Sequence, residues 1–378
     1  MLKDPKFRRF GESRALAVFS IFSKWFSCCL TLLLDEHVRR ALSGTGCNLY
    51  GLCSGHRCHE ITAGLKVLAR HSRLGGKGQN VFIASLDVGQ AFDHLTIPRA
   101  SASLQWLQVD DELIFALMEG AEFQFQEICS HPIPWDSCIR TGSLEGPPLW
   151  NAQCISMFGP VFLNWERLGK GLVLSAEAGG ICVSHFVWAD NVLLVARSLP
   201  MLTSMIVELN QPLYLRGFHW KASSLEFMSV ASDDTDPLVV HLSPSSGSSG
   251  NCPSSALVFK RVSVLKILGT VIGRNFIDHE DIRHRMRWTV GAFWKEKSYD
   301  QSRLISIHSK IRRYDSRVRS KFLYGLEGAS IHAKALRYIH KEEGEMLRRM
   351  VWRNKRADES WSSFLVTAIL SWSSGFVS

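Results

Sequence analysis

The sequence predicts an α+β protein with a helical, basic C-terminal unit, and three observations support this class. Before residue 241, apolar runs such as VFIASLDV and ICVSHFVWADNVLLVA, typical of buried strands, alternate with helical patterns. Residues 241–255, HLSPSSGSSGNCPSS, have the composition of a flexible insertion. From Asp281 onward the pattern is mostly helical and rich in arginine and lysine. Strands interleaved with helices, followed by a helical block, favour the α+β class.

The N-terminal segment allows two interpretations. KDPKFRRF followed by ALAVFSIFSKWFSCCLTLLL resembles a signal anchor, because a basic stretch precedes a long apolar one. Lys24 lies near the centre of that stretch, where insertion into a bilayer costs about 2.5–3.5 kcal/mol, and the charged DEHVRR follows directly. We therefore predict a buried amphipathic helix, with a membrane anchor as the alternative. The expected location is intracellular, nuclear or cytoplasmic, and not secreted.

Local patterns predict the elements that follow. Residues 151–168 and 199–216 have helical periodicity. ICVSHFVWADNVLLVA predicts a β-hairpin that turns at residues 189–191. ALVFKRVSVLKILGTVIG, residues 256–273, predicts two short strands.

The positive charge is concentrated in one part of the chain. The net charge is +9 and the isoelectric point is near 9.1, which suggests a polyanionic partner. Between Phe259 and Arg356 there are 24 lysines and arginines against 10 acidic residues, so the rest of the chain is net negative. This distribution indicates a subdomain that grips a phosphate backbone, with a solvated helical face as the alternative.

The ten cysteines are scattered, which argues against a disulfide framework and for a reducing compartment. One group of potential metal ligands has irregular spacing, whereas zinc sites use two well-spaced pairs. We interpret this group as structural, with a metal site as the alternative. Its members are Cys47, Cys53, His56, Cys58 and His59.

Aspartates stand at the ends of two apolar runs. Asp87 and Asp93 follow VFIASL, and Asp190 lies at the tip of the predicted hairpin. A desolvated carboxylate is costly unless a cation offsets its charge. If the two strands pair in one sheet, the carboxylates of Asp87 and Asp190 converge, and Mg²⁺ prefers such oxygen ligands. Each aspartate alone is weak evidence, because turns favour aspartate for other reasons.

Seven segments resemble, in the correct order, the motifs of one enzyme family. They are RALAVFSIFSKWF at 14–26, YGLCSGHRCHE at 50–60, SLDVGQAFDHL at 85–95, RTGSLEGPPLW at 140–150, VWADNVLLVA at 187–196, GFHWKASSLEFM at 217–228 and VSVLKILGTVI at 262–272. They are similar to two finger motifs, motifs A, B, C and D, and the primer-grip region of the reverse transcriptases of non-LTR (LINE-type) retrotransposons. The resemblance extends from about Arg14 to Trp361.

This resemblance implies a right-hand polymerase with fingers at 1–80, a palm with an antiparallel sheet at 81–275 and a helical thumb and downstream region at 276–378. The implied function is an RNA-directed DNA polymerase that uses Mg²⁺ or Mn²⁺. Its expected partners are an RNA template, a DNA primer and deoxynucleoside triphosphates, with no membrane and no obligate protein partner. Only 13 residues stand before Arg14, with no endonuclease-like segment among them, so target-site nicking is expected to come from elsewhere or to be lost.

The resemblance also assigns roles to single residues. Asp87, the Val88 carbonyl and Asp190 would bind metal, and Asn191 stands beside them at the second aspartate of motif C. Phe92 occupies the position of the steric gate that selects deoxynucleotides, with a core aromatic as the alternative. The other expected contacts to nucleotide or template are Gly142, Glu145, Gly146, Arg14 and Lys24. Asp93 is expected to cap the next helix rather than to bind metal.

Four departures from the family pattern predict an impaired enzyme. Asn191 replaces the second aspartate of motif C and offers an oxygen without a charge. Glu145 replaces a glutamine, Trp150-Asn151 replaces Ser-Pro, and Ser224 stands where a lysine is usual. The alternative is a catalytically dead, nucleic-acid-binding remnant of such an element.

Overall fold

The computed structural model forms two compact units, which are described separately. Unit 1 comprises residues 1–61 and 68–265, and unit 2 comprises residues 62–67 and 266–378. The residues that the structure describes are 21–45, 47–51, 53, 55–74, 80–122, 125–128, 131–134, 143–174, 181–230, 236–242, 256–273, 279–295, 302, 304–324, 326, 329, 331–351, 358, 360 and 362–363.

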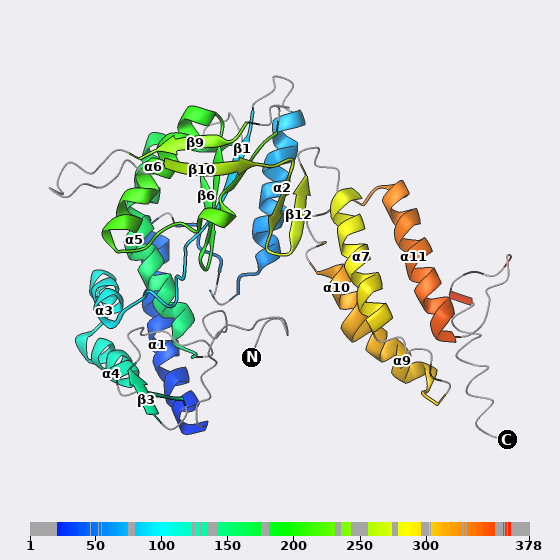
Figure 1. Cartoon of the computed structure of the whole chain (residues 1–378), viewed down its shortest axis with the longest axis horizontal. Coiled ribbons are helices and arrows are strands. Elements are labelled where there is room, and N and C mark those ends of the chain that lie inside the picture. Colours follow the sequence, from blue (N-terminus) through cyan, green and yellow to red (C-terminus); the bar gives the residue numbers. More distant parts are fainter. Residues whose placement is uncertain are drawn as a thin grey trace. The chain divides into compact units, whose positions relative to one another are not determined.

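Unit 1 is built on a six-stranded sheet in the order β6-β7-β1-β8-β10-β9 (Figure 1). All neighbouring strands are antiparallel except β8 and β10, which are parallel. The strands are β6 (His185–Trp188), β7 (Asn191–Ala196), β1 (Phe82–Asp87), β8 (Glu226–Ser229), β10 (Ala256–Arg261) and β9 (Leu238–His241). The mixed α+β class and the antiparallel-rich sheet are therefore confirmed.

Strand β1 lies inside the sheet because its side chains suit burial on both faces. Its residues from Phe82 to Leu86 are all buried, and the strand pairs with β7 on one side and β8 on the other. A strand covered on both faces is expected to be almost continuously apolar. The run ends at Asp87, which is half-buried and marks one end of the sheet.

Helices α5 (Gly146–Leu168) and α6 (Leu199–Leu215) complete the core of unit 1. Helix α6 packs on β7, β1 and β9, and α5 packs on α6 (Figure 1). Helix α5 ends at Gly169, whose left-handed φ of 61° is the usual conformation of a helix stop. Helix α6 begins after Ser198, whose hydroxyl accepts a hydrogen bond from the Met201 amide.

Further helices pack against α5 and against one another. Helices α1 (Ile21–Thr45) and α3 (Ile97–Trp106) pack on α5, and α4 (Asp111–Glu122) packs on α3. Two small hairpins also belong to this unit. They are β2 (Phe125–Ile128) with β3 (His131–Pro134), and β4 (Leu172–Val173) with β5 (Cys182–Val183).

Unit 2 is mainly helical and has its own apolar core. Helix α2 (Cys58–Leu74) contributes residues 62–67 to it. The core joins side chains of α7, η3, α10 and α11, among them Phe293, Val318 and Ile339. The helices are α7 (His279–Lys295), α9 (Ile307–Arg313), the π-helical segment η3 (Tyr314–Arg319), α10 (Ser320–Leu323) and α11 (Ala333–Val351).

The structure confirms the predicted helices at 151–168 and 199–216 to within a few residues. The prediction of two strands over residues 256–273 is wrong, because three are present. After β10, the strands β11 (Val264–Ile267) and β12 (Thr270–Gly273) form a hairpin. A sharp turn at Leu268 and Gly269, both with positive φ, divides the apolar run that we took for one strand.

The prediction of a buried helix near the N-terminus is wrong for the first half of α1. Ile21 and Phe22 are each 84% exposed, and Trp25 is 69% exposed. Only Leu34 and Val38 of this helix are fully buried. Among the described residues, no helix combines the length and the apolar character needed to cross a bilayer.

The predicted fingers, palm and thumb boundaries stay predictions. The two compact units divide the chain between Leu265 and Lys266, ten residues before the predicted boundary at 275/276. The contacts of the chain therefore place the hairpin strand β12 with the C-terminal helices and not with the sheet.

Candidate active site

Two acidic positions far apart in sequence meet at one end of the sheet of unit 1. Strand β1 ends at Asp87, and its partner in the register of β7 is Asn191. The Val88 amide donates a 2.8 Å hydrogen bond to the Asp190 carbonyl, which ties the end of β1 to the β6–β7 turn. The antiparallel pairing therefore brings Asp87, Asp190 and Asn191 together, as the sequence predicted. Their metal-binding role stays a prediction.

The carboxyl group of Asp87 lies in surroundings that disfavour its charge. Burial raises its pKa, and the neighbouring charge of Asp190 raises it further. The cation of Lys221 and a hydrogen bond from Ser224 act in the opposite direction. Because the folded-state pKa lies above the unfolded value, ionisation of Asp87 reduces stability as the pH rises through that range. A cation bound between the carboxylates would remove this penalty.

The oxygen donors at this end of the sheet fit a hard divalent cation. The Asn191 Oδ1 atom is buried and accepts no hydrogen bond from the described residues. No group of three His, Cys, Asp or Glu side chains among those residues could hold a metal. A site here would therefore rest on two carboxylates, completed by neutral oxygens and ligand phosphates, which is the usual environment of Mg²⁺.

The turn that carries Asp190 is strained and tightly supported. Ala189 has a positive φ of 52°, an uncommon conformation for a residue with a side chain. The Tyr50 and Gly51 amides both donate hydrogen bonds to the Val187 carbonyl. A Cβ atom at Gly51 would lie 2.2 Å from the Ala189 nitrogen, so backbone packs directly on backbone. Gly51 therefore fixes the position of the turn.

Replacing Gly51 with alanine is expected to displace this turn and to lower the stability of unit 1 by about 1–3 kcal/mol, as for other overpacked sites. The clashing atoms belong to the backbone and cannot rotate away. Gly44 is the matched control, because a Cβ there meets nothing within 4 Å. Chemical denaturation of both variants tests the prediction. Equal stability of Gly51→Ala and Gly44→Ala would show that the turn is free to move.

The loop after α6 supplies a cation that sequence reasoning missed. Its backbone runs beside the end of β1, because the Lys221 amide donates to the Asp87 carbonyl at 2.8 Å. The same lysine lies close enough to lower the pKa of Asp87. Ser224, noted as a departure from the family lysine, donates its hydroxyl hydrogen to the Lys221 carbonyl, and it lies close enough to lower the pKa of Asp87. Lys221 lies only three residues before Ser224, so the sequence alone could have identified it as a basic residue of this segment.

The first turns of α5 carry several buried polar atoms that lack partners among the described residues. Glu145 is the residue before the helix, and its Oε2 atom is one of these atoms. Gly146, the first helical residue, is buried. Buried polar groups are normally hydrogen-bonded, so these atoms need partners, such as water, an ion or a ligand, that the described residues do not supply. The others in this region are Ser143 Oγ, Trp150 Nε1, Asn151 Oδ1 and Gln153 Nε2.

Phe92 lies in the turn between β1 and α3 and is half-buried. Its ring packs on Trp150 with centroids 5.7 Å apart, so the side chain already has a core contact. Its role as a steric gate stays a prediction. The expectation that Asp93 caps the next helix is wrong, because α3 begins after Thr96 and Asp93 is an exposed turn residue.

The remaining predicted contacts are not brought to this end of the sheet by any described interaction. Arg14 and Gly142 lie outside the described residues. Lys24 is exposed on the first half of α1.

The Cys/His group forms no metal site among the described residues. Burial raises the pKa of the Cys53 thiol to about 11, so it stays protonated at neutral pH. His56 Nδ1 lies 2.9 Å from a Glu60 carboxylate oxygen. The structural interpretation of this segment stays a prediction.

No protein-family model and no curated protein matches this sequence. Solved telomerase structures match at low similarity. The match to telomerase from Candida tropicalis in complex with a TWJ fragment of telomeric RNA covers 92% of this chain and 54% of the telomerase chain. The sequence identity is 10% and the TM-score is 0.45. The match to apo telomerase from the same organism, truncated from its C-terminal domain, covers 68% of this chain and 45% of the telomerase chain. The sequence identity is 10% and the TM-score is 0.42.

The match to telomerase from Candida albicans in complex with the TWJ fragment covers 93% of this chain and 54% of the telomerase chain. The sequence identity is 12% and the TM-score is 0.38. The chain thus spans about half the length of the telomerases that it matches.

Proposed function

We propose that this chain is an RNA-directed DNA polymerase domain that joins nucleotides by metal-assisted transfer. The observation that carries the proposal is the pairing of Asp87 with Asn191, which brings the Asp190 turn beside Asp87. Burial and the neighbouring Asp190 raise the pKa of Asp87 at the end of a buried strand, and a bound cation would offset this cost. The ordered motifs around these residues resemble those of LINE-type retrotransposon reverse transcriptases, which supports the assignment to such an element.

In this proposal the chain contributes mainly positioning and charge stabilisation. The carboxylates of Asp87 and Asp190, helped by the Val88 carbonyl, would hold Mg²⁺ or Mn²⁺, which stabilises the attacking and leaving oxygens when bound. The polar start of α5, with Glu145 and Gly146, would face the nucleotide and template. Phe92 would restrict the space beside the sugar.

Primer extension on an RNA template tests the proposal. Purified protein with Mg²⁺ or Mn²⁺ is expected to incorporate deoxynucleotides, and Asp87→Ala is expected to reduce the rate by roughly 10³-fold or more, since it removes charge stabilisation of the transition state. Asp236→Ala is the matched control, because Asp236 is exposed and lies outside the seven motif segments. Incorporation that survives Asp87→Ala would refute the assignment of this site.

A second candidate is a nucleic-acid-binding remnant without catalysis. It is favoured by Asn191, which lacks a charge, and by the Glu145 carboxylate, which adds a negative charge where a triphosphate would approach. The basic helices of unit 2 would suffice for binding. RNA binding that weakens steeply with salt, together with no incorporation under any metal condition, would support this candidate over the first.

A further inference from the structure

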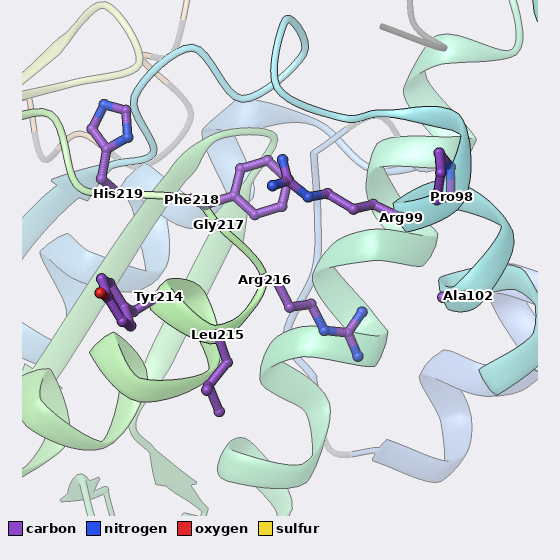
Figure 2. A pocket seen from close by; sticks show the side chains of 9 residues that line it. All are labelled: Pro98, Arg99, Ala102, Tyr214, Leu215, Arg216, Gly217, Phe218 and His219. Carbon is purple, nitrogen blue, oxygen red and sulfur yellow. The ribbon is translucent and has the colours of Figure 1, made fainter. Parts of the chain in front are cut away.

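A cavity of about 930 Å³ opens on unit 1 between α3 and the end of α6 (Figure 2). Its volume lies at the upper end of the range for small-molecule sites. None of its lining residues belongs to the candidate metal site, and none is acidic. They are Pro98, Arg99, Ala102, Tyr214, Leu215, Arg216, Gly217, Phe218 and His219.

Two guanidinium groups in this lining have no carboxylate partner among the described residues. Arg99 donates one hydrogen bond, from Nη1 to the His94 carbonyl, and lies 5.3 Å over the ring of Phe218 (Figure 2). Arg216 extends towards α5 (Figure 2). Its Nη1 donates to the hydroxyls of Ser103 on α3 and Ser156 on α5, and its Nη2 donates to the Ser156 carbonyl. These neutral partners leave both positive charges uncompensated.

The two arginines are held in place by the fold. Gly217 has a φ of 70°, and a Cβ atom there would lie 2.2 Å from Arg99 Nη2, so the guanidinium lies directly against the backbone of the turn. Burial lowers the pKa of Arg216, which shows that its charge is partly desolvated. A fixed, partly desolvated cation favours an anionic ligand more strongly than a flexible surface lysine does.

The apolar residues of the lining indicate which kind of anion would fit the cavity. Tyr214 and Leu215 are 58% and 70% exposed, and they present apolar surface beside the charges. All lining residues come from two short segments, 98–102 and 214–219, so the cavity is compact. A peptide would need an extended groove or a free strand edge. A ligand that joins a phosphate to a flat apolar group fits both parts of this lining.

We propose that this cavity binds a nucleotide, with its phosphates on Arg99 and Arg216 and its base against Tyr214 and Leu215. Guanidinium groups pair with phosphate through two parallel hydrogen bonds, and Arg99 has N–H groups left for this. The lining contains neither Asp87 nor Asp190, and the proposal does not depend on the proposed polymerase function.

Calorimetric titration of the full chain with ATP in EDTA tests the proposal without metal-dependent binding at Asp87. ATP is expected to bind the natural chain and Asp87→Ala equally, and at least tenfold more weakly to Arg99→Ala. Ala102→Glu, at an exposed lining position of α3, is expected to weaken binding similarly. Arg197→Ala is the matched control for loss of one exposed arginine and is expected to bind normally. Circular dichroism confirms that each variant folds.

Two further titrants identify which part of ATP is recognised. Adenosine and inorganic tripolyphosphate are each expected to bind at least tenfold more weakly than ATP. Equal ATP affinity in Arg99→Ala, Ala102→Glu and the natural chain would overturn the proposal, as would the absence of ATP binding. Arg99-dependent binding of a Glu/Phe peptide in place of ATP would overturn the nucleotide assignment in favour of a protein partner.

Discussion

Replacing Asp281 with alanine is expected to lower the free energy of unfolding of unit 2 by about 3–5 kcal/mol. The Asp281 carboxylate is buried and lies 2.9 Å from Lys66 Nζ and 3.0 Å from Arg285 Nε. It also accepts a 3.1 Å hydrogen bond from the Val271 amide. Its removal takes away the carboxylate that both buried cations contact, and the other acceptor described for Arg285 is the neutral Thr270 hydroxyl. Leaving buried charges unpaired is among the most destabilising effects of a single substitution.

Asp315→Ala is the matched control within the same unit. Asp315 pairs with Arg319 at 3.4 Å, but both side chains are about half exposed. Exposed pairs contribute about 0–1 kcal/mol, so this variant is expected to stay close to the natural chain. Hydrogen exchange of the amides of α7 and α11 reports on unit 2 specifically. If the amides of α7 and α11 exchanged at the same rate in both variants, the buried ion network would contribute no more to the stability of unit 2 than an exposed ion pair does.

The parts of the fold that depend on local patterning were predictable from the sequence. The run VFIASL and the hairpin around Asp190 are continuous apolar segments bounded by turn residues, which is what a buried strand requires. The predicted meeting of Asp87 with Asp190 needed one more assumption, that the two strands are neighbours. The register between Asp87 and Asn191 bears out that geometric expectation, while the chemistry assigned to it awaits the experiments above.

The features that the sequence did not predict depend on contacts between segments distant in sequence. Nothing in the sequence near Gly51 indicates that its α-carbon lies against the backbone of Ala189. The ion pair of Lys66 with Asp281 joins residues 215 positions apart. Lys310 is fully buried and donates to the Met350 carbonyl at the end of α11, although lysine is seldom buried. These residues are charged, so an analysis of helical periodicity predicts that they are exposed.

The misassigned elements have a common cause as well. The first half of α1 is apolar but exposed, because apolar composition shows only that a segment is suited to burial, not that a partner covers it. The run over residues 264–273 divides at Leu268-Gly269, where a leucine adopts a positive φ that its residue type disfavours. In both places the prediction was wrong because the tertiary structure, and not the local pattern, decides the outcome.

Replacing Asn191 with aspartate is expected to raise Mg²⁺-dependent primer extension, on the order of tenfold, the scale on which changes around a metal site act. The Asn191 Oδ1 atom is buried and has no hydrogen-bond partner among the described residues. Asn191 stands opposite Asp87 in the strand pair, so the substitution adds a charge where the proposed metal lies. Without metal, the added carboxylate is expected to raise the pKa of Asp87 further and to lower the melting temperature. Mg²⁺ is expected to restore the melting temperature, because the ion compensates the carboxylates.

The melting temperature separates a metal effect from a general effect of added charge. Asn48→Asp is the matched control, because Asn48 lies beside His185 at the opposite end of β6 from the turn. This variant is expected to lose stability to the same extent with and without Mg²⁺. A melting temperature of Asn191→Asp that is indifferent to Mg²⁺ would show that the oxygens at this end of the sheet do not share a cation. The nucleic-acid-binding remnant would then be the better account of the chain, since its basic unit 2 needs no metal at Asp87.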